Sequence, residues 1–356
     1  MTKYLPAAVA AVSCILFFWA APAALPDAHI ARDWAKDPAI LRIDQQPERL
    51  VAIGDPHGDL ERLVVLLVRA GLIGTKVKQP GAVDWTGGNA VLVVTGDLID
   101  KGPHSVAVIR LLAAVREAAR RGGGQVVITM GNHEAEFLSG LGKAGKKAKT
   151  DDFAGDLESN GVDRGAVLAC RGDIGEFLCS LPFAAKVGDW FFSHAGNAGG
   201  RSIAQLSQAL QEGIVKDGFI AKELSDPDSL LEARLGEGKI WFHPPEKGPD
   251  AKKAERGILE ADAAALGVRH IVQGHQPGEV QFADGVVRHK GEMFQRWGLL
   301  FLIDTGMSRD IDDSQGALLS ITRGAKAVAV CPDGSETRLW DADLSQDAGR
   351  AAPCGR

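Results

Sequence analysis

Short polar clusters follow five apolar stretches of this chain. After residues 49–53, for example, Asp55 and His57 place a carboxylate and an imidazole two positions apart. A single cluster of this kind is ordinarily a turn or a helix cap, but five such clusters predict a common site. The eight residues concerned are Asp55, His57, Asp97, Asp100, Asn132, His133, His194 and His275.

The chemistry of these side chains suits metal ions. Carboxylate, imidazole and amide oxygen without thiolate favour Mn²⁺, Fe or Zn²⁺ in a mixed nitrogen and oxygen shell. The set is large enough for two ions, and two metals about 3.5–4 Å apart can clamp a phosphoryl group. Asp97 follows the central stretch of the first three and is the natural bridge. The other predicted ligands are Asp55 and His57 for one ion, and Asn132, His194 and His275 for the other.

The residue after the amide ligand predicts an acid catalyst. His133 is expected to pair with Asp100, and such a dyad would protonate the leaving alkoxide or phenoxide of a phosphate ester. Two neighbouring acids have simpler explanations. Asp59 starts a predicted helix and is expected to cap it. Glu134 could either support a ligand or be a first-turn acid favoured by the helix dipole.

The elements that must position these clusters alternate in type. Residues 49–55, 89–97 and 124–134 predict buried strands, whereas residues 59–72 and 102–122 have apolar side chains at helical spacing. This alternation implies a parallel sheet with right-handed crossovers. Ligands of such sheets bind beyond the carboxyl ends of the strands, which is where the first three clusters lie.

The second half of the chain predicts more strands. They follow a mostly helical insert over about residues 200–262, and we expect two packed sheets with helices outside, in one α/β domain. The predicted strands cover residues 269–275, 298–306, 317–324, 325–331 and 336–340. The predicted segments are an irregular lead-in over 25–48, the domain over 49–345 and a C-terminal tail over 346–356.

Five motifs in order carry a resemblance to a known family. "GDPHGD", "GDLIDKG", "GNHE", "SHAG" and "GHQP" resemble those of the calcineurin-like metallophosphoesterase superfamily, close to its phosphoprotein phosphatase branch. "LFLIDTGMS" is similar to the Shewanella-like bacterial phosphatases, and the match spans about residues 49–320. The resemblance implies a sandwich of two mixed sheets flanked by helices and a dinuclear centre. It also implies hydrolysis by a metal-bound hydroxide without a covalent intermediate, and the roles assigned above agree with the family's.

The chain departs from this branch where substrate phosphate is held. Lys101 stands where the branch usually has an arginine, and a lysine cannot make a planar bidentate contact. The family's second phosphate-holding arginine has two candidates here, Arg234 and Arg288.

The function expected from the residues and the resemblance is hydrolysis of phosphate monoesters. The substrate would be a phosphoprotein, at serine, threonine or tyrosine, or a small phosphoester. A nucleotide or dinucleoside polyphosphate hydrolase is an alternative on the same core. A metal-binding scaffold without catalysis is the alternative from another class, and the intact His133–Asp100 pair argues against it.

The N-terminus predicts export. Lys3, an apolar run to about Trp19 and the small residues 21–23 follow the order of a signal peptide over residues 1–24. The apolar run is short for a membrane span of roughly 20 residues, so an uncleaved anchor is the alternative. We expect a periplasmic or secreted protein without stable membrane insertion after cleavage. The net charge of −6 gives no support for binding nucleic acid.

Four cysteines would remain after cleavage, and they allow three pairings. In a continuous helix, Cys170 and Cys179 would lie about 13 Å apart axially, whereas a disulfide tolerates about 7 Å between Cα atoms. Gly172 and Gly175 could break that helix and permit the bridge. A bridge from Cys331 to Cys354 would tie down the tail.

Overall fold

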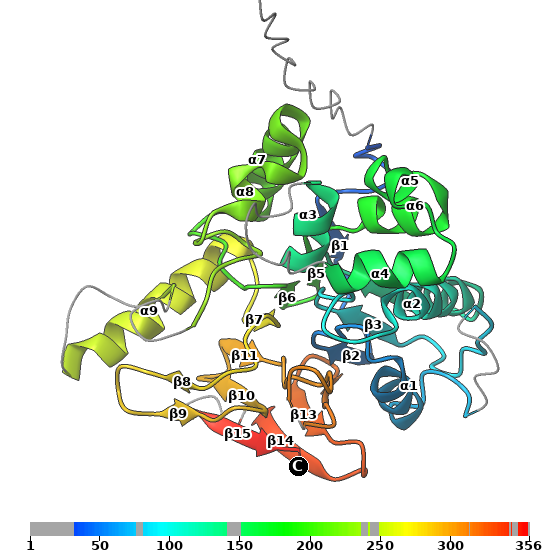
Figure 1. Ribbon diagram of the computed structural model, residues 1–356. Helices are drawn as coiled ribbons and strands as arrows, with labels where there is room; N and C mark the ends of the chain where they lie inside the picture. The colour runs from blue at the N-terminus through cyan, green and yellow to red at the C-terminus, as the bar shows by residue number, and fades with distance from the viewer. Residues whose placement is uncertain are drawn as a thin grey trace, which may run out of the picture.

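Two large mixed β-sheets form the centre of the protein, and helices flank them (Figure 1). This computed structural model describes residues 32–75, 81–140, 151–235, 241–242, 249–312, 314–341, 343 and 348–354. The predicted signal peptide over residues 1–24 lies outside the described residues. Among the residues that are described, no helix is both long and apolar enough to cross a bilayer.

The first sheet has six strands in the order β14-β13-β12-β2-β3-β4. The three strands β2, β3 and β4 are parallel, and helices α1 and α2 connect them, as the alternating pattern predicted. The other three strands add an antiparallel half. The strands are β2 Arg49–Ile53, β3 Val91–Val94, β4 Gln125–Ile128, β12 Leu318–Thr322, β13 Lys326–Val330 and β14 Glu336–Asp341; the helices are α1 Leu60–Arg69 and α2 Ser105–Arg121.

The second sheet has seven strands in the order β1-β5-β6-β7-β11-β10-β15. Its two edges differ from the prediction. The lead-in contains a regular strand, β1, parallel to β5, and the tail contains β15, antiparallel to β10. The strands are β1 Ile40–Ile43, β5 Ala184–Val187, β6 Trp190–Ser193, β7 His270–Gln273, β10 Glu292–Arg296, β11 Leu300–Leu302 and β15 Arg350–Pro353; a separate hairpin pairs β8 Val280–Gln281 with β9 Val287–Arg288.

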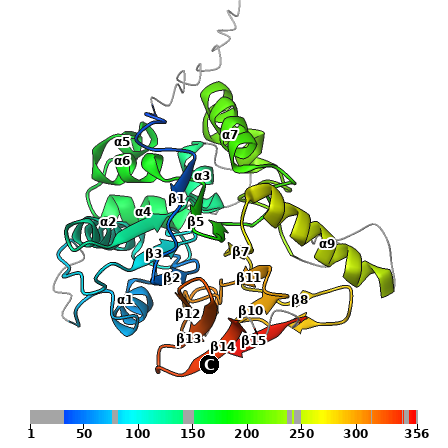
Figure 2. The same cartoon turned by 180° about the vertical axis from the view of Figure 1, so that it is seen from behind.

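The remaining helices form two groups. One group lies on the side of α2, which packs against α4 and α6, and the other, which corresponds to the predicted insert, projects on the opposite side (Figures 1 and 2). Helix α3 contacts α5 of the first group and η1 and α8 of the second. The first group contains α3 Asn132–Leu138, α4 Asp151–Ser159, α5 Arg164–Leu168 and α6 Gly172–Ser180; the second contains α7 Ile203–Asp217, the 3₁₀ helix η1 Gly218–Ile220, α8 Lys222–Ser225 and α9 Pro249–Leu266.

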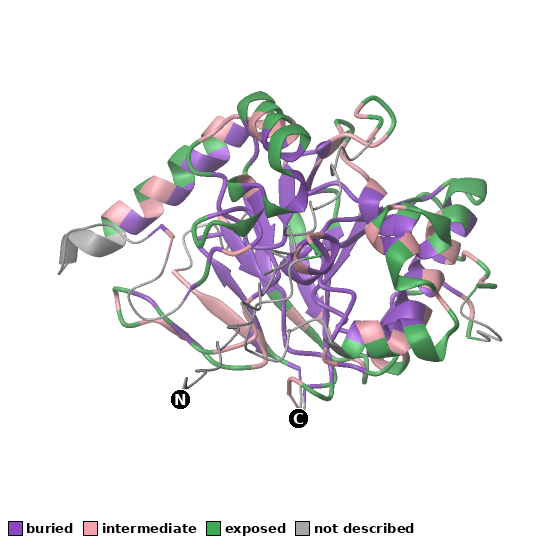
Figure 3. Ribbon diagram, turned by 45° about the horizontal axis from the view of Figure 1, so that its top comes forward, coloured by how far each residue is buried: buried purple, intermediate pink, exposed green. Residues whose placement is uncertain are grey.

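The apolar core has two layers because the central strands are buried on both faces. In β2, Leu50 and Ala52 pack between the sheets with Trp190 and Phe301 of the second sheet, whereas Val51 faces the helices. Strands buried on both faces read as continuous apolar runs, which explains the unbroken pattern of this stretch. Figure 3 shows the buried inner strands and the exposed outer sides of the helices.

Two disulfides join cysteines in the part of the chain that the structure describes. Cys170 and Cys179 are joined with Cα atoms 5.7 Å apart, because the chain breaks between α5 and α6 instead of continuing as one helix. Gly172 has a φ of +74° at this break, a conformation that favours glycine. Cys331, after β13, bonds to Cys354, after β15, so this bridge links the two sheets as well as the tail.

Candidate metal centre

The carboxyl ends of β2, β3 and β4 and those of β6 and β7 in the second sheet bring the five polar clusters together. Their side chains are buried, and none of the eight is more than 6% exposed. Several of these loops bend sharply, because non-glycine residues adopt positive φ angles that cost about 1–3 kcal/mol each. These residues are His57, Asp97, Asp100, Lys101 and His275.

Asp97 lies between two imidazoles. Its Oδ2 is 3.3 Å from His57 Nε2 and 3.4 Å from His194 Nε2. The side chains here form two groups whose potential ligand atoms lie close to one another. Asp97 belongs to both groups, as a bridging ligand must. The first group is His57, Asp97 and His133; the second is Asp97, His194 and His275. Asp97 therefore lies in both groups, its role as the bridge stays a prediction, and His133 joins the first group.

Hydrogen bonds orient the imidazoles toward the centre. Nδ1 of His57 lies 3.0 Å from the Ile99 carbonyl oxygen, and Nδ1 of His194 lies 2.8 Å from that of Thr95. Each ring can therefore donate from Nδ1 and direct Nε2 toward a ligand, the arrangement typical of metal-binding histidines. His275 Nε2 is buried and has no hydrogen-bond partner among the described residues, an unsatisfied state that a bound metal would relieve.

Two further predicted ligands lie beside the second group. Asn132 Oδ1 is 3.0 Å from His194 Nε2, as expected for two ligands of one ion. Asp55 Oδ2 accepts the His275 main-chain N–H at 2.8 Å and lies 3.9 Å from His194 Nδ1. Asp55 belongs to neither of the two groups, so its ligation of the first ion stays a prediction.

His57 and His194, on either side of Asp97, have pKa values shifted in opposite directions. Burial lowers the pKa of His57 to about 4, although the Asp97 carboxylate opposes this. Burial also acts on His194, but the carboxylates of Asp97 and Asp55 outweigh it and raise that pKa to about 10. The carboxylates around His194 therefore favour a bound positive charge.

The predicted acid pair is formed. His133 Nδ1 is 2.8 Å from Asp100 Oδ2, and the other carboxylate oxygen of Asp100 accepts the Phe153 N–H at 3.0 Å. Burial opposes protonation of His133, but Asp97 and Asp100 outweigh it and raise its pKa. His133 can therefore carry a proton on Nε2, which lies 3.9 Å from Asp97 Oδ2 at the centre.

Two further acids are buried near the centre: Glu134, for which the sequence left two explanations open, and Asp304, which it did not single out. Glu134 is fully buried behind Asp97, where burial and the Asp97 charge raise its pKa to about 7. Asp304 is 2% exposed, and its carboxylate accepts the Gly306 N–H at 2.8 Å. Burial raises the pKa of Asp304 to about 6. Their motifs, "GNHE" and "LFLIDTG", were the available signals.

The three candidates for phosphate binding have different environments. Lys101 directly follows Asp100 and is partly exposed. Arg234 is exposed, and its charge helps burial and His194 to lower the pKa of His275. The prediction for Arg288 is wrong, because this side chain is fully buried and its guanidinium donates to main-chain carbonyls. Those carbonyls belong to Gln276, Gly278, Glu292 and Asp304.

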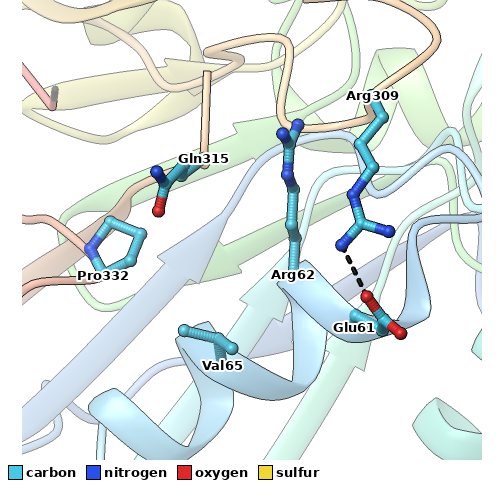
Figure 4. A pocket seen from close by; sticks show the side chains of 6 residues that line it. All are labelled: Glu61, Arg62, Val65, Arg309, Gln315 and Pro332. Atoms are coloured by element: carbon cyan, nitrogen blue, oxygen red, sulfur yellow. Dashed lines mark hydrogen bonds and ion pairs between the residues drawn. The ribbon is translucent and has the colours of Figure 1, made fainter. Parts of the chain in front are cut away.

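A surface pocket of about 350 Å³ lies between α1 and the loop after β11, and none of the eight cluster residues lines it (Figure 4). Arg309 and Glu61 form an ion pair of 2.6 Å at its edge. Asp59 caps α1 as predicted, through the Arg62 N–H, and also accepts the Arg309 N–H at 3.3 Å. The pocket is lined by Glu61, Arg62, Val65, Arg309, Gln315 and Pro332.

Comparison with known proteins identifies the family. Residues 48–279 match the family model described as calcineurin-like phosphoesterase. The chain belongs to the calcineurin-like phosphoesterase family. The family membership and the fold that the motifs predicted are confirmed. Calcineurin-like phosphoesterases use dinuclear metal centres, and the two ligand groups around Asp97 fit such a centre.

Individual relatives of this calcineurin-like phosphoesterase are phosphatases by name. Shewanella-like protein phosphatase 2 of Arabidopsis thaliana is 38% identical over 331 residues, covering 78% of this chain and 76% of the relative. A solved structure of a cold-active protein tyrosine phosphatase shares the fold, with a TM-score of 0.62, 20% identity and coverage of 87% of this chain and 82% of that one. The symmetrical bis(5'-nucleosyl)-tetraphosphatase of an Enterobacter species is 31% identical over 111 residues, 31% of this chain and 32% of that protein. The chain is a metal-dependent phosphoester hydrolase.

Proposed function

We propose that this hydrolase removes phosphate from phosphoproteins. It would use two metal ions bound where the carboxyl ends of strands from the two sheets meet. The observation that carries the metal part is the position of Asp97 Oδ2 between His57 Nε2 and His194 Nε2. The similarity to a protein phosphatase over 78% of the chain supports the substrate class. The tetraphosphatase similarity covers 31% of the chain and gives the alternative less support.

The proposed ligands divide around Asp97. One ion would be bound by Asp97 together with His57 and Asp55. The other would be bound by Asp97 together with Asn132, His194 and His275. The imidazole, carboxylate and amide donors suit Mn, Fe or Zn. When bound, the ions would supply Lewis acidity and a water of lowered pKa at neutral pH.

The remaining side chains handle the substrate and the proton. His133, held by Asp100 at 2.8 Å, donates the proton of Nε2 to the leaving oxygen. Lys101 and Arg234 bind the phosphate oxygens by charge. We expect Lys101→Ala to raise KM about tenfold while metal binding is unchanged, and Lys101→Arg to retain phosphate binding; steady-state kinetics with calorimetry checks both.

A substrate panel tests the proposed function. Phosphate release is measured from phosphotyrosine peptides, phosphoserine peptides and a dinucleoside polyphosphate, with Mn²⁺ and with a chelator. We expect turnover of the phosphopeptides that the chelator abolishes. Turnover of the dinucleoside polyphosphate alone would favour the alternative substrate class. Metal binding without turnover of any substrate would favour the scaffold reading.

We also propose that the protein is exported. The two disulfides support this, because disulfides persist in oxidising compartments and are rare in the cytosol. The order of residues at the N-terminus supports it as well. Sequencing the N-terminus of the protein from fractionated cells is the test. A chain that begins at Met1 in the cytoplasmic fraction would contradict export.

A further inference from the structure

The buried carboxylate of Glu134 makes four main-chain contacts behind the metal centre. Oε2 accepts the N–H of Asp97 at 3.0 Å and that of Gly131 at 2.8 Å. Oε1 accepts the N–H of Leu98 at 2.8 Å and that of Ile99 at 3.2 Å. Glu134 thus receives three successive N–H groups of the loop after β3 and ties this loop to the one after β4.

The opposite side of the same three peptides holds His57. The Asp97 and Leu98 carbonyls accept the N–H groups of His57 and Gly58, both at 2.8 Å. The Ile99 carbonyl lies 3.0 Å from His57 Nδ1. Residues 97–99 are therefore fixed between the Glu134 carboxylate and the His57 segment, so the position of Glu134 is transmitted to the first ligand group.

The second ligand group is oriented by other contacts. His194 Nδ1 bonds to the Thr95 carbonyl at 2.8 Å, and the His275 N–H bonds to Asp55 at 2.8 Å. Neither of these contacts passes through Glu134, which reaches the second group only through the Gly131 N–H beside Asn132. A change at Glu134 should therefore act unequally on the two groups, although Asp97 is common to both.

We propose that Glu134 is a positioning residue that sets the affinity of the ion at His57 and Asp97, selectively over the ion at His194 and His275. This inference rests on the proposed two-metal function. Glu134 touches neither ion nor substrate in this role. It acts through the peptides of residues 97–99, whose positions it fixes with two oxygens.

The isosteric variant Glu134→Gln is a sharp probe. A glutamine offers one acceptor oxygen and one NH₂ group, so in either orientation two of the four N–H groups would face a donor. Changes in residues that orient metal ligands typically cost about 10–100-fold in affinity. We expect Glu134→Gln to lose this factor for one of two Mn²⁺ ions, with the other within a few-fold of wild type.

Calorimetric Mn²⁺ titration of the chelator-treated full-length chain measures this. Asp262→Asn is the matched control, because this buried carboxylate accepts a single N–H, from Gly200, and an asparagine can still accept it. The control should bind both ions as the wild type does. Equal binding of both ions by Glu134→Gln and wild type would overturn the proposal, as would equal weakening of both ions in a folded variant.

Glu134→Asp keeps both oxygens but moves them one methylene away, and it decides the matter if Glu134→Gln does not fold. We expect Glu134→Asp to bind one of the two Mn²⁺ ions more weakly than wild type does and the other as wild type does. Wild-type affinity for both ions would overturn the positioning role. Failure of the proposed function is separable, because a wild type that binds two ions and hydrolyses no phosphoester would contradict only the activity. A wild type that binds no ion would contradict the metal assignment itself.

Discussion

Single carboxylates decide how this site works, and Asp97 and Asp100 have different tasks. Asp97 lies within 3.4 Å of two imidazole nitrogens and can join two ions. Asp100 is fully buried and faces His133. We therefore propose that Asp97 arranges the metals and that Asp100 keeps a proton available on His133.

Asp100→Asn should slow hydrolysis according to the leaving group. The substitution removes the charge that favours protonated His133, and general acid catalysis contributes about 10²–10⁴-fold. We expect kcat for alkyl phosphates to fall at least about 10²-fold. The rate with 4-nitrophenyl phosphate should change little, because that leaving group needs no proton. Asp163→Asn, at the exposed cap of α5, is the control. Equal losses on both substrates would contradict the acid role.

The residue types were readable in the sequence, but their contacts were only partly so. Asp55, His57 and Asp97 follow unbroken apolar stretches, so the pattern predicted that they would meet. Arg288 has no such signal, because its burial depends on carbonyls from three other segments of the chain. For Glu134 the sequence left ligand support and a first-turn acid open, because its contacts depend on the directions of the N–H groups in residues 97–99.

At the scale of elements, the parallel half of the first sheet was predictable because β2, β3 and β4 alternate with amphipathic helices. The four-residue strand β1 was not, because it pairs with β5, more than 100 residues away. Strand β7 contacts both sheets through the aromatic ring of His270. His270 stacks on Trp190 with ring centroids 4.0 Å apart and meets Trp340 edge-on at 4.4 Å.

His270 should make stability depend on pH. Burial lowers its pKa from the ordinary histidine value of 6.5 to about 4, although a hydrogen bond to the Gly298 carbonyl opposes this. Between these values the unfolded chain binds the proton and the folded chain does not. The free energy of unfolding therefore falls as pH drops from 6.5 to 4, by an amount on the order of 3 kcal/mol for this group.

His270→Phe isolates that contribution. Wild type and variant are unfolded with denaturant at several pH values. The difference between their free energies of unfolding should shift in favour of the variant by about 3 kcal/mol between pH 7 and pH 4. A difference that is independent of pH would contradict the lowered pKa.

At the scale of the whole molecule, two sheets share one core and one set of site loops, so their alignment matters to the centre. The bridge from Cys331 to Cys354 links β13 of one sheet to β15 of the other. The bridge from Cys170 to Cys179 stays within the helical group beside α2. The first bridge also closes the longer loop, with a sequence separation of 23 against 9.

Removing the inter-sheet bridge should therefore destabilise the protein more. Replacing Cys331 and Cys354 by serine is expected to cost on the order of 2–4 kcal/mol of unfolding free energy. The same change at Cys170 and Cys179 should cost about 1 kcal/mol less, because of the shorter loop. Denaturant unfolding under oxidising conditions measures both. A larger loss at Cys170 and Cys179 would contradict this ranking.

The central claim is that two ions joined by Asp97 drive phosphoester hydrolysis. The most direct test titrates Mn²⁺ into the chelator-treated protein and follows bound metal and phosphate release together, in wild type and Asp97→Asn. We predict that wild-type activity appears with metal and saturates at two ions per chain, and that Asp97→Asn loses both the second ion and the activity. Full activity after chelation, or an active Asp97→Asn variant that still binds two ions, would contradict the claim.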